Sequence, residues 1–217
     1  RRARGLVPNA AGELLAAFAK RSQQDIERVA GDIQALRGLR VGRVRLAAVE
    51  GIAHEFLPNL AANFRETHAG IHFELEVCPQ GDIARRIRDG EADIGITLAW
   101  LPEPEIHVEL RHPAPVLAVM APDHPLARHR QLSLAQVATY PLALPPKDSS
   151  VRQLLDAGCS RQGLRYQTVF SSNQLDSLVS FAAAGGGAIC FYGEVSIRGR
   201  LKAGTIAAVP LRDREMN

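Results

Sequence analysis

The stretch Arg4-Gly-Leu-Val-Pro-Asn-Ala-Ala-Gly-Glu-Leu-Leu, residues 4–15, decides the fold, because it marks the start of a long helix. Asn9 is a favourable N-cap residue, and the sequence from Ala10 to about Leu36 is rich in helix formers. At 1.5 Å per residue, such a helix of about 27 residues extends roughly 40 Å. A short segment then separates this helix from the first expected strand, namely Arg37-Gly38-Leu39-Arg40.

Apolar residues follow one face of this helix at spacings of three and four residues, with Ser22 filling one gap. The seam begins at Leu15 and continues through Phe18, Ile26, Val29, Ile33 and Leu36. A narrow apolar stripe of this kind resembles a coiled-coil seam and favours pairing with a second copy of the chain. The sequence therefore predicts a dimerisation helix. The alternative is a helix that packs on its own domain.

Beyond residue 41, candidate strands and helices alternate, which is typical of a mostly parallel sheet. The first unit has expected strands at 44–49, 71–77 and 92–97 and expected helices at 54–66 and 82–89, with a tight turn at 50–52. The second unit has expected strands at 116–120, 142–144, 168–171, 188–191 and 206–211 and expected helices at 134–137, 149–157 and 174–184. Two α/β lobes joined by two crossing strands would form a cleft, and small ligands bind in such clefts.

Composition excludes several classes of protein. The 217 residues are 46% apolar with a net charge of +3, which is ordinary for a globular protein. We expect no membrane span, because no run of about 18 apolar residues exists, and no signal peptide, because the first residues are charged. Cys78, Cys159 and Cys190 form no C-x-x-C pair and no zinc pattern, so buried, reduced thiols in a cytoplasmic protein are expected. Neither a metal nor a cofactor is expected.

No motif indicates catalysis. Gly185-Gly186-Gly187 lacks the Lys-Ser/Thr of a phosphate loop and is expected to form a turn between helix and strand. His68 and His72 are separated by Gly70, which argues against a metal-binding helix face. With no acid–base or nucleophilic constellation, the sequence does not predict an enzyme.

An ordered set of motifs resembles the LysR-type transcriptional regulators and spans nearly the whole chain. The motifs are Arg4-Gly-Leu-Val-Pro-Asn-Ala-Ala-Gly-Glu-Leu-Leu, Gly42-Arg-Val-Arg-Leu, Phe56-Leu-Pro-Asn-Leu, Gly90-Glu-Ala-Asp-Ile-Gly-Ile, Ala121-Pro-Asp-His-Pro-Leu-Ala and Leu178-Val-Ser-Phe-Ala-Ala-Ala-Gly-Gly-Gly-Ala-Ile. Each motif is weak alone, and the ordered set is specific.

The resemblance implies a fold and a domain plan. Residues 1–8 would be the remnant of a DNA-binding wing, and residues 9–40 a long linker and dimerisation helix. Two periplasmic-binding-protein-like α/β lobes joined by crossing strands would follow: lobe I at 41–114 with 209–217, and lobe II at 115–208. The family's winged helix-turn-helix and C-terminal helix are expected to lie outside the given chain. Arg1, Arg2 and Arg4 would approach double-stranded DNA in the full-length protein, a homodimer or homotetramer.

Three expected helix starts should face the cleft, after Gly51, at Ser149-Ser150 and after Asn173. Unpaired N–H groups and the helix dipole favour an anion there, so the sequence predicts a small-molecule effector, a carboxylate or similar anion. Capping of the helices by Ser149 and Asn173 is the structural alternative. By resemblance, the effector contacts would be Glu50, Gly51, Ile52, Thr97, Ser149, Ser150, Asn173 and Phe191, the last in a segment more aromatic than the family usually has.

Glu50 stands against the anion hypothesis. The family commonly has a small polar residue at this position, and a carboxylate facing the cleft would repel an anion or favour a cationic or hydroxylated ligand. The alternative for Glu50 is a solvated turn residue. A second function remains open for the whole chain: a solute-binding protein of a transport system has the same two-lobed fold, but has no need of a coiled-coil helix before its first strand.

Overall fold

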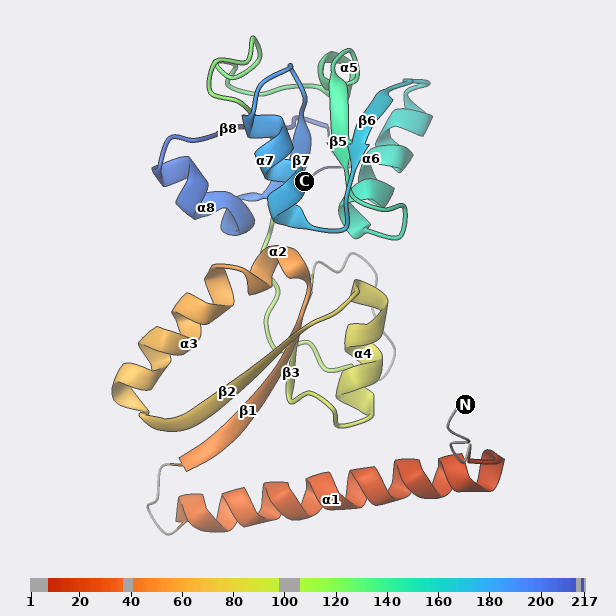
Figure 1. Cartoon of the computed structure of the whole chain (residues 1–217), viewed down its shortest axis with the longest axis vertical. Coiled ribbons are helices and arrows are strands. Elements are labelled where there is room, and N and C mark those ends of the chain that lie inside the picture. Colours follow the sequence, from red (N-terminus) through yellow and green to blue (C-terminus); the bar gives the residue numbers. More distant parts are fainter. Residues whose placement is uncertain (1–7, 37–40, 98–105, 214–215, 217) are drawn as a thin grey trace, which may run out of the picture.

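The computed structural model describes residues 8–36, 41–97, 106–213 and 216. Within these ranges, one long helix precedes two α/β lobes, and each lobe has its own sheet and core (Figure 1). The expected α/β class with two lobes is confirmed. Arg1, Arg2 and Arg4 lie outside the described residues.

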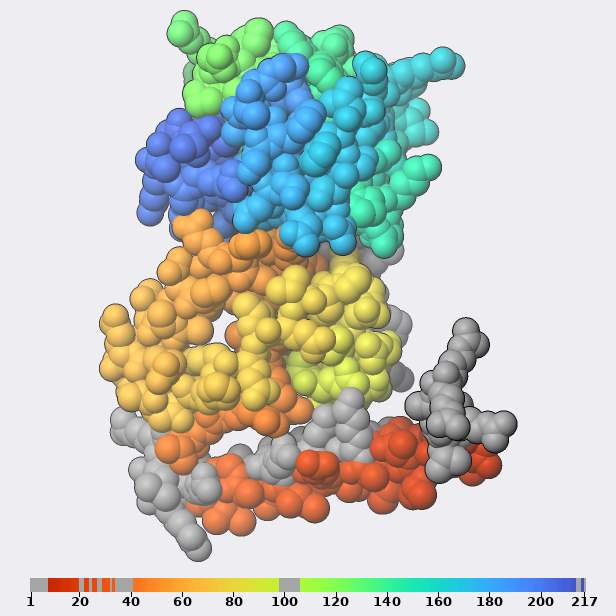
Figure 2. All heavy atoms as spheres, viewed as in Figure 1, coloured from red at the N-terminus to blue at the C-terminus, as the bar shows by residue number. Residues whose placement is uncertain are grey.

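Helix α1 (Ala10–Leu36) begins and ends where the sequence pattern predicts. Asn9 caps it, because the Asn9 Oδ1 atom accepts a hydrogen bond from the Gly12 N–H at 2.9 Å. The helix forms a separate layer at the foot of lobe I, at the end of the molecule remote from lobe II (Figures 1 and 2).

Lobe I is built on a three-stranded parallel sheet with the order β2-β1-β3. Its elements are β1 (Val41–Ala48), α2 (Glu50–Ala53), α3 (Phe56–Thr67), β2 (Gly70–Val77), α4 (Gln80–Arg88) and β3 (Ile94–Ile96). Successive residues of a strand point to opposite faces of the sheet. Ala47 accordingly packs with Ile83 of α4, and Ala48 packs with Leu57 of α3.

A glycine allows α4 to lie close to this sheet. A Cβ atom on Gly95 would stand 2.6 Å from the Ile83 Cγ2 atom. The sequence Gly-Ile at the end of the sheet thus fixes the packing distance of the helix, and with it the position of the carboxyl edge of lobe I.

Lobe II contains the larger core. Its elements are β4 (Val116–Met120), α5 (Leu134–Val137), β5 (Pro141–Leu144), α6 (Ser150–Arg161), β6 (Gln167–Ser171), α7 (Leu175–Ala183), β7 (Cys190–Gly193), α8 (Glu194–Lys202) and β8 (Ala207–Pro210). Strand β4 is buried along its whole length between β7 and β8, both antiparallel to it. Strands β5 and β6 are parallel, and the Ala143 N–H donates to the Ile189 oxygen at 2.9 Å, which links β5 to the segment entering β7.

The sheet of lobe II is covered on both faces. Leu142 and Phe191 belong to the cluster that includes Val151 and Leu155 of α6, and Ala143 and Cys190 belong to the cluster of α7 and α8. The continuous apolar runs of these strands are therefore explained by burial on two sides.

The end of the chain departs from the expected plan. Residues 209–217 were expected to belong with lobe I, but the described ones lie in lobe II. Val209 pairs with Ala118 of β4, and Leu211 and Met216 join the lobe II core. The Asp213 carboxylate accepts hydrogen bonds from the Leu134 N–H at 2.8 Å and the Gln162 side chain at 2.7 Å, which anchors this segment to lobe II. Neither of the two expected crossing strands is seen as a strand in the described ranges: residues 106–115, which lead into β4 of lobe II, have no regular secondary structure.

Two smaller expectations are corrected as well. Residues 50–52 form the one-turn helix α2 instead of a turn, and α8 was not predicted at all. None of the helices in the described ranges is long and apolar enough to cross a membrane.

The three cysteines are buried and free, as expected. Burial raises the pKa of the Cys159 thiol to about 11 and also raises the pKa values of Cys78 and Cys190. The thiolate is the reactive form of cysteine, so the folded chain holds these groups in an unreactive state.

At pH 8, each thiol of the native protein should therefore react with a disulfide reagent such as DTNB more slowly than free cysteine, and Cys159 at least about a hundredfold more slowly, because little thiolate forms. All three thiols should react quickly once the chain is unfolded in denaturant. Rapid reaction of even one thiol in the native protein would show that its site is open to solvent.

Candidate functional site

The carboxyl ends of the parallel strands of the two lobes face each other. Glu50 follows β1 and Thr97 follows β3 in lobe I, whereas Ser149 and Ser172 follow β5 and β6 in lobe II. In Figure 1, α2 lies directly beneath the segment that enters α7. The carboxyl edge of a parallel sheet is where ligands of α/β proteins bind, so this junction is the candidate site.

Glu50 bridges the two lobes. The N–H of Leu175, the first residue of α7, donates a hydrogen bond to the Glu50 Oε1 atom at 2.9 Å, although the two residues are 125 positions apart. The N-cap residue of α7 is Gln174, and its side chain makes no capping bond. The carboxylate from lobe I thus acts as the cap and as the negative charge that the start of a helix favours. The solvated-turn interpretation of Glu50 is wrong.

A second glutamate makes a parallel contact. The Glu55 Oε2 atom accepts a hydrogen bond from the Gly199 N–H of α8 at 2.9 Å. A Cβ atom on Gly199 would stand 2.7 Å from this oxygen, and a Cβ atom on Gly51 would stand 2.8 Å from the Ser196 Oγ atom. A side chain at either position would displace the Ser196 hydroxyl or the Glu55 carboxylate from its present place, and α2 is in direct contact with lobe II here (Figure 2).

Charged side chains surround this contact. The His54 Nε2 atom lies 3.7 Å from Asp176 of α7 and 4.0 Å from Glu50, and Arg200 of α8 pairs with Asp176 at 3.0 Å. His54 and Asp176 are about half exposed, so these pairs add little to stability. They do determine the local charge, because two carboxylates, those of Glu50 and Asp176, lie at the start of α7.

The start of α6 differs from that of α7. Ser149 is the N-cap residue of α6, but its side chain makes no capping hydrogen bond, so the capping alternative is not supported there. Both Ser149 and Ser150 are half-buried. Asn173 is exposed and is not the N-cap residue of α7; the hydroxyl of Ser172 instead accepts a hydrogen bond from the Gln174 N–H at 3.0 Å.

Two polar atoms at the carboxyl edge of lobe I have no protein partner among the described residues. They are Thr97 Oγ1, after β3, and Gln80 Oε1, at the start of α4, and both atoms are buried. A buried polar atom without a partner costs about 1–3 kcal/mol, so such atoms mark sites with unused hydrogen-bonding capacity. Sequence reasoning identified Thr97 and missed Gln80.

Phe191 and Tyr192 lie on opposite faces of β7 and pack on different core clusters of lobe II. Phe191 is fully buried in the lobe II core, which corrects its assignment as an effector contact. Tyr192 points to the opposite face of β7 and is half-buried. Burial, followed by the neighbouring Cys190 and Glu50, raises the pKa of Tyr192, so its hydroxyl is protonated. Two further residues expected to contact the effector, Gly51 and Ile52, lie against the protein itself. Gly51 lies against α8, and Ile52 packs on the lobe I core.

Arg152 does not supply a positive charge to the cleft. Its Nε atom pairs with Asp156 at 3.0 Å, and its guanidinium lies over the Tyr166 ring at 5.6 Å. The Tyr166 hydroxyl also donates to Asp156. Arg152 is thus held within α6 and its neighbouring strand.

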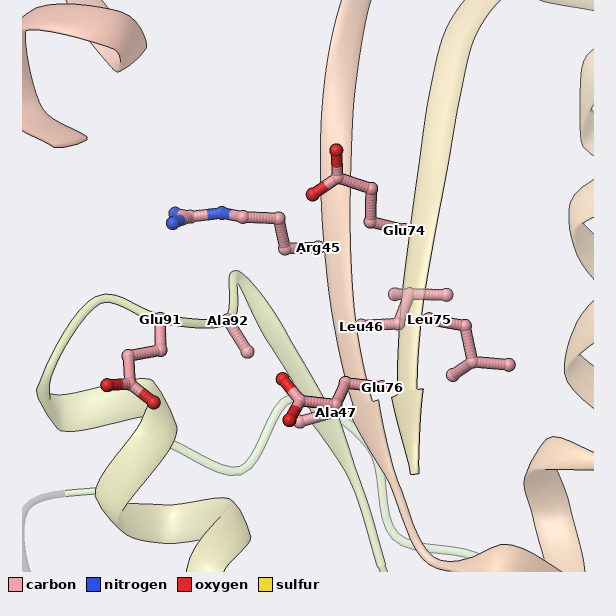
Figure 3. A pocket seen from close by; sticks show the side chains of 8 residues that line it. All are labelled: Arg45, Leu46, Ala47, Glu74, Leu75, Glu76, Glu91 and Ala92. Carbon is pink, nitrogen blue, oxygen red and sulfur yellow. The ribbon is translucent and has the colours of Figure 1, made fainter. Parts of the chain in front are cut away.

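A small hollow on lobe I lies apart from this junction (Figure 3). Its volume is about 110 Å³, and Arg45, Glu74, Glu76 and Glu91 line it together with apolar residues of β1 and β2. The charges are already paired: Arg86 binds both Glu76 and Glu91, and Arg45 binds Asp93. Drug-sized ligands need roughly 300 Å³ or more, so this hollow is not the candidate site. Within the described ranges, no three or more His, Cys, Asp or Glu side chains are placed to hold a metal ion.

The long helix carries the second candidate surface. In the single chain, Phe18, Ile26, Val29 and Ile33 are 61%, 70%, 52% and 46% exposed. The side chain of Leu36 lies outside the described residues. The alternative in which α1 buries this seam on its own domain is therefore not observed.

The comparisons with known proteins agree on one family. The model of the LysR substrate binding domain family matches residues 37–217. The HTH-type transcriptional regulator CbbR of Rhizobium meliloti (strain 1021) is 24% identical over 209 residues, which are 96% of this chain and 66% of that protein. The chain spans about half to two thirds of the length of the curated relatives it matches.

Two solved structures share the fold. The effector binding domain of QuiR in complex with shikimate superposes with a TM-score of 0.64 at 19% identity, over 80% of this chain and 82% of that chain. A full-length OxyR variant from Pseudomonas aeruginosa superposes with a TM-score of 0.71 at 18% identity, over 99% of this chain and 70% of that chain.

The contact between Glu55 and Gly199 can be tested with a glycine pair. Replacing glycine by alanine within a helix usually stabilises a protein by roughly 0.5–1 kcal/mol. Gly81→Ala in α4, where nothing lies within 4 Å of the added carbon, should raise the melting temperature. Gly199→Ala should not raise it, because the methyl group displaces the Glu55 carboxylate from the Gly199 N–H. If thermal denaturation showed the same increase in melting temperature for Gly81→Ala and Gly199→Ala, the contact between Glu55 and Gly199 would be contradicted.

Proposed function

The chain belongs to the LysR substrate binding domain family, and on that premise we propose that it is the effector-sensing and linker part of a DNA-binding transcriptional regulator. The observation that carries the proposal is the match of residues 37–217 to this family in a chain whose preceding helix, α1, leaves its apolar seam exposed. The similarity to CbbR, a transcriptional regulator, supports a regulator and not an enzyme. Because its target is the chromosome, we place the protein in the cytoplasm.

In this proposal the junction between the lobes binds a small effector. Thr97 and Gln80 offer hydrogen bonds from lobe I, and Ser149 and Ser150 offer hydroxyls and helix N–H groups from lobe II. An N–H-rich helix start favours a carboxylate, and we propose that the acid group of the effector binds at α6. The QuiR domain, which shares this fold, holds shikimate.

The effector acts by shifting the balance between arrangements of the two lobes. A change at the junction alters the geometry of the dimer or tetramer, and with it the spacing of the DNA-binding heads. The heads themselves are proposed to lie outside this chain, since the chain spans 66% of the CbbR relative.

The alternative, a solute-binding protein of a transport system, explains the two lobes but not α1. A monomeric binding protein gains nothing from a helix of 27 residues with an exposed apolar seam. The regulator proposal accounts for both parts of the chain.

DNA binding decides between the two functions. The full-length gene product should bind the duplex upstream of its own gene, and the chain of 217 residues alone should bind it at least about a hundredfold more weakly, because base contacts come from the recognition helix. Fluorescence anisotropy at fixed salt, with a scrambled duplex as the control, measures both affinities. A full-length protein that binds the two duplexes equally weakly would exclude a sequence-specific regulator.

Dimerisation through α1 gives a separate prediction. Ile26→Glu and Ile33→Glu should each weaken the dimer at least about tenfold, because a charge replaces a side chain that the partner helix would bury. Ala17→Glu is the control: nine residues from Ile26 at about 100° per residue, it lies on the opposite face of the helix. Sedimentation equilibrium that shows no difference between Ile26→Glu and Ala17→Glu would disprove the seam.

A further inference from the structure

The start of α7 already holds a carboxylate. Glu50 reaches it from the other lobe, and its Oε1 atom lies 2.9 Å from the N–H of Leu175, a residue that is 2% exposed. The first N–H groups of a helix have no partner within the helix, so an acceptor must come from elsewhere. Here the chain supplies its own acceptor, at a position where an anionic ligand would otherwise bind both lobes.

Local charge strengthens the effect. Asp176, in the first turn of α7, lies beside Glu50, and each carboxylate is approached by the same His54 ring. The cation nearest to Asp176, Arg200, is paired with it at 3.0 Å and also donates to Ser180 at 3.2 Å. A second anion entering here would meet two carboxylates and no uncommitted cation among these residues.

Several other residues support the contact between Glu50 and the start of α7. Helix α2 contacts α8 beside Glu50, and a Cβ atom on Gly51 or Gly199 would displace the Ser196 hydroxyl or the Glu55 carboxylate, so the two lobes are packed where Glu50 crosses. A flexible surface glutamate would not have such support. The position of Glu50 therefore follows from the fold of both lobes.

We infer that Glu50 determines which class of ligand the cleft accepts: its carboxylate occupies the anion position at α7 and selects for small molecules that present a hydroxyl or an ammonium group, not an acid group, at this end. The inference rests on the proposed function and refines it. A carboxylate accepts up to about four hydrogen bonds, of which Leu175 uses one, so Glu50 can serve a ligand donor. An acid group of the same ligand is then directed to α6, where Ser149 and Ser150 lie.

Succinate is the probe, because it carries an acid group at each end. Thermal unfolding of the 217-residue chain is followed in about 20 mM succinate and in sodium chloride of equal ionic strength. Wild type should show at most a small difference between the two salts, because one acid group of succinate can reach α6 while the other would meet Glu50. Glu50→Ser, which opens the start of α7 to an anion, should melt about 2 °C or more higher in succinate than in chloride.

Glu66→Ser is the matched control. It makes the same substitution at an exposed position in the last turn of α3, far along the helix from the junction. It should respond to succinate as wild type does. Equal responses of wild type and Glu50→Ser, whether both rise or neither does, overturn the inference, and so does a response of Glu66→Ser as large as that of Glu50→Ser.

Should the serine variant fail to fold, Glu50→Gln gives the same comparison, because it removes the charge and keeps an oxygen for the Leu175 N–H. The melting temperature of Glu50→Gln should rise in succinate, but less than that of Glu50→Ser. If it does not rise, the inference is wrong. DNA binding by the full-length protein tests the regulator separately. A DNA-binding protein whose Glu50 variants ignore succinate contradicts the Glu50 inference alone, and a succinate gain without DNA binding contradicts the regulator alone.

Discussion

The N–H groups at the start of a helix need acceptors, and at α7 the acceptor comes from the opposite lobe. This one requirement ties together features that are far apart in the sequence. Glu50, two residues after β1, supplies that acceptor, and Gly51 beside it and Gly199 facing Glu55 lie at the same contact between the lobes. The junction is therefore a packed and hydrogen-bonded interface along α2, and not an open gap between two domains.

Local pattern was enough to predict most of the elements. The spacing of apolar residues and the cap at Asn9 fixed α1 to the residue, and the boundaries of β4 and α5 were also correct. Helix α8 was not predicted, because only Ile197 is buried along it and no apolar periodicity marks the helix in the sequence. The last strand was predicted as an element but placed in the wrong lobe, since its partner β4 lies about 90 residues earlier and no local signal names the partner.

The sequence could predict where the candidate site lies, but not which interactions its side chains make. Thr97, Ser149 and Ser150 were assigned as effector contacts by resemblance, and the structure places Thr97 after β3 and the two serines after β5; their contact with an effector stays a prediction. The roles of Glu50 and Glu55 could not be read from the sequence, because their hydrogen-bond donors lie 125 and 144 residues away. Phe191 and Tyr192 show the limit at the level of single residues: adjacent strand residues point to opposite faces, so Phe191 lies in one core cluster and Tyr192 packs against the other.

Strand β1 has a mechanical consequence. It begins at Val41, close to the end of α1, and runs without a break to Ala48, two residues before Glu50. Strand β2 pairs with it along its whole length, and β3 pairs with its last three residues, 46–48. Strand β1 runs through the centre of lobe I, with the junction of the two lobes at one end and helix α1 at the other (Figure 1). A displacement of Glu50 along this axis would be carried toward Val41 by one continuous strand, with no loop inside β1 to absorb it.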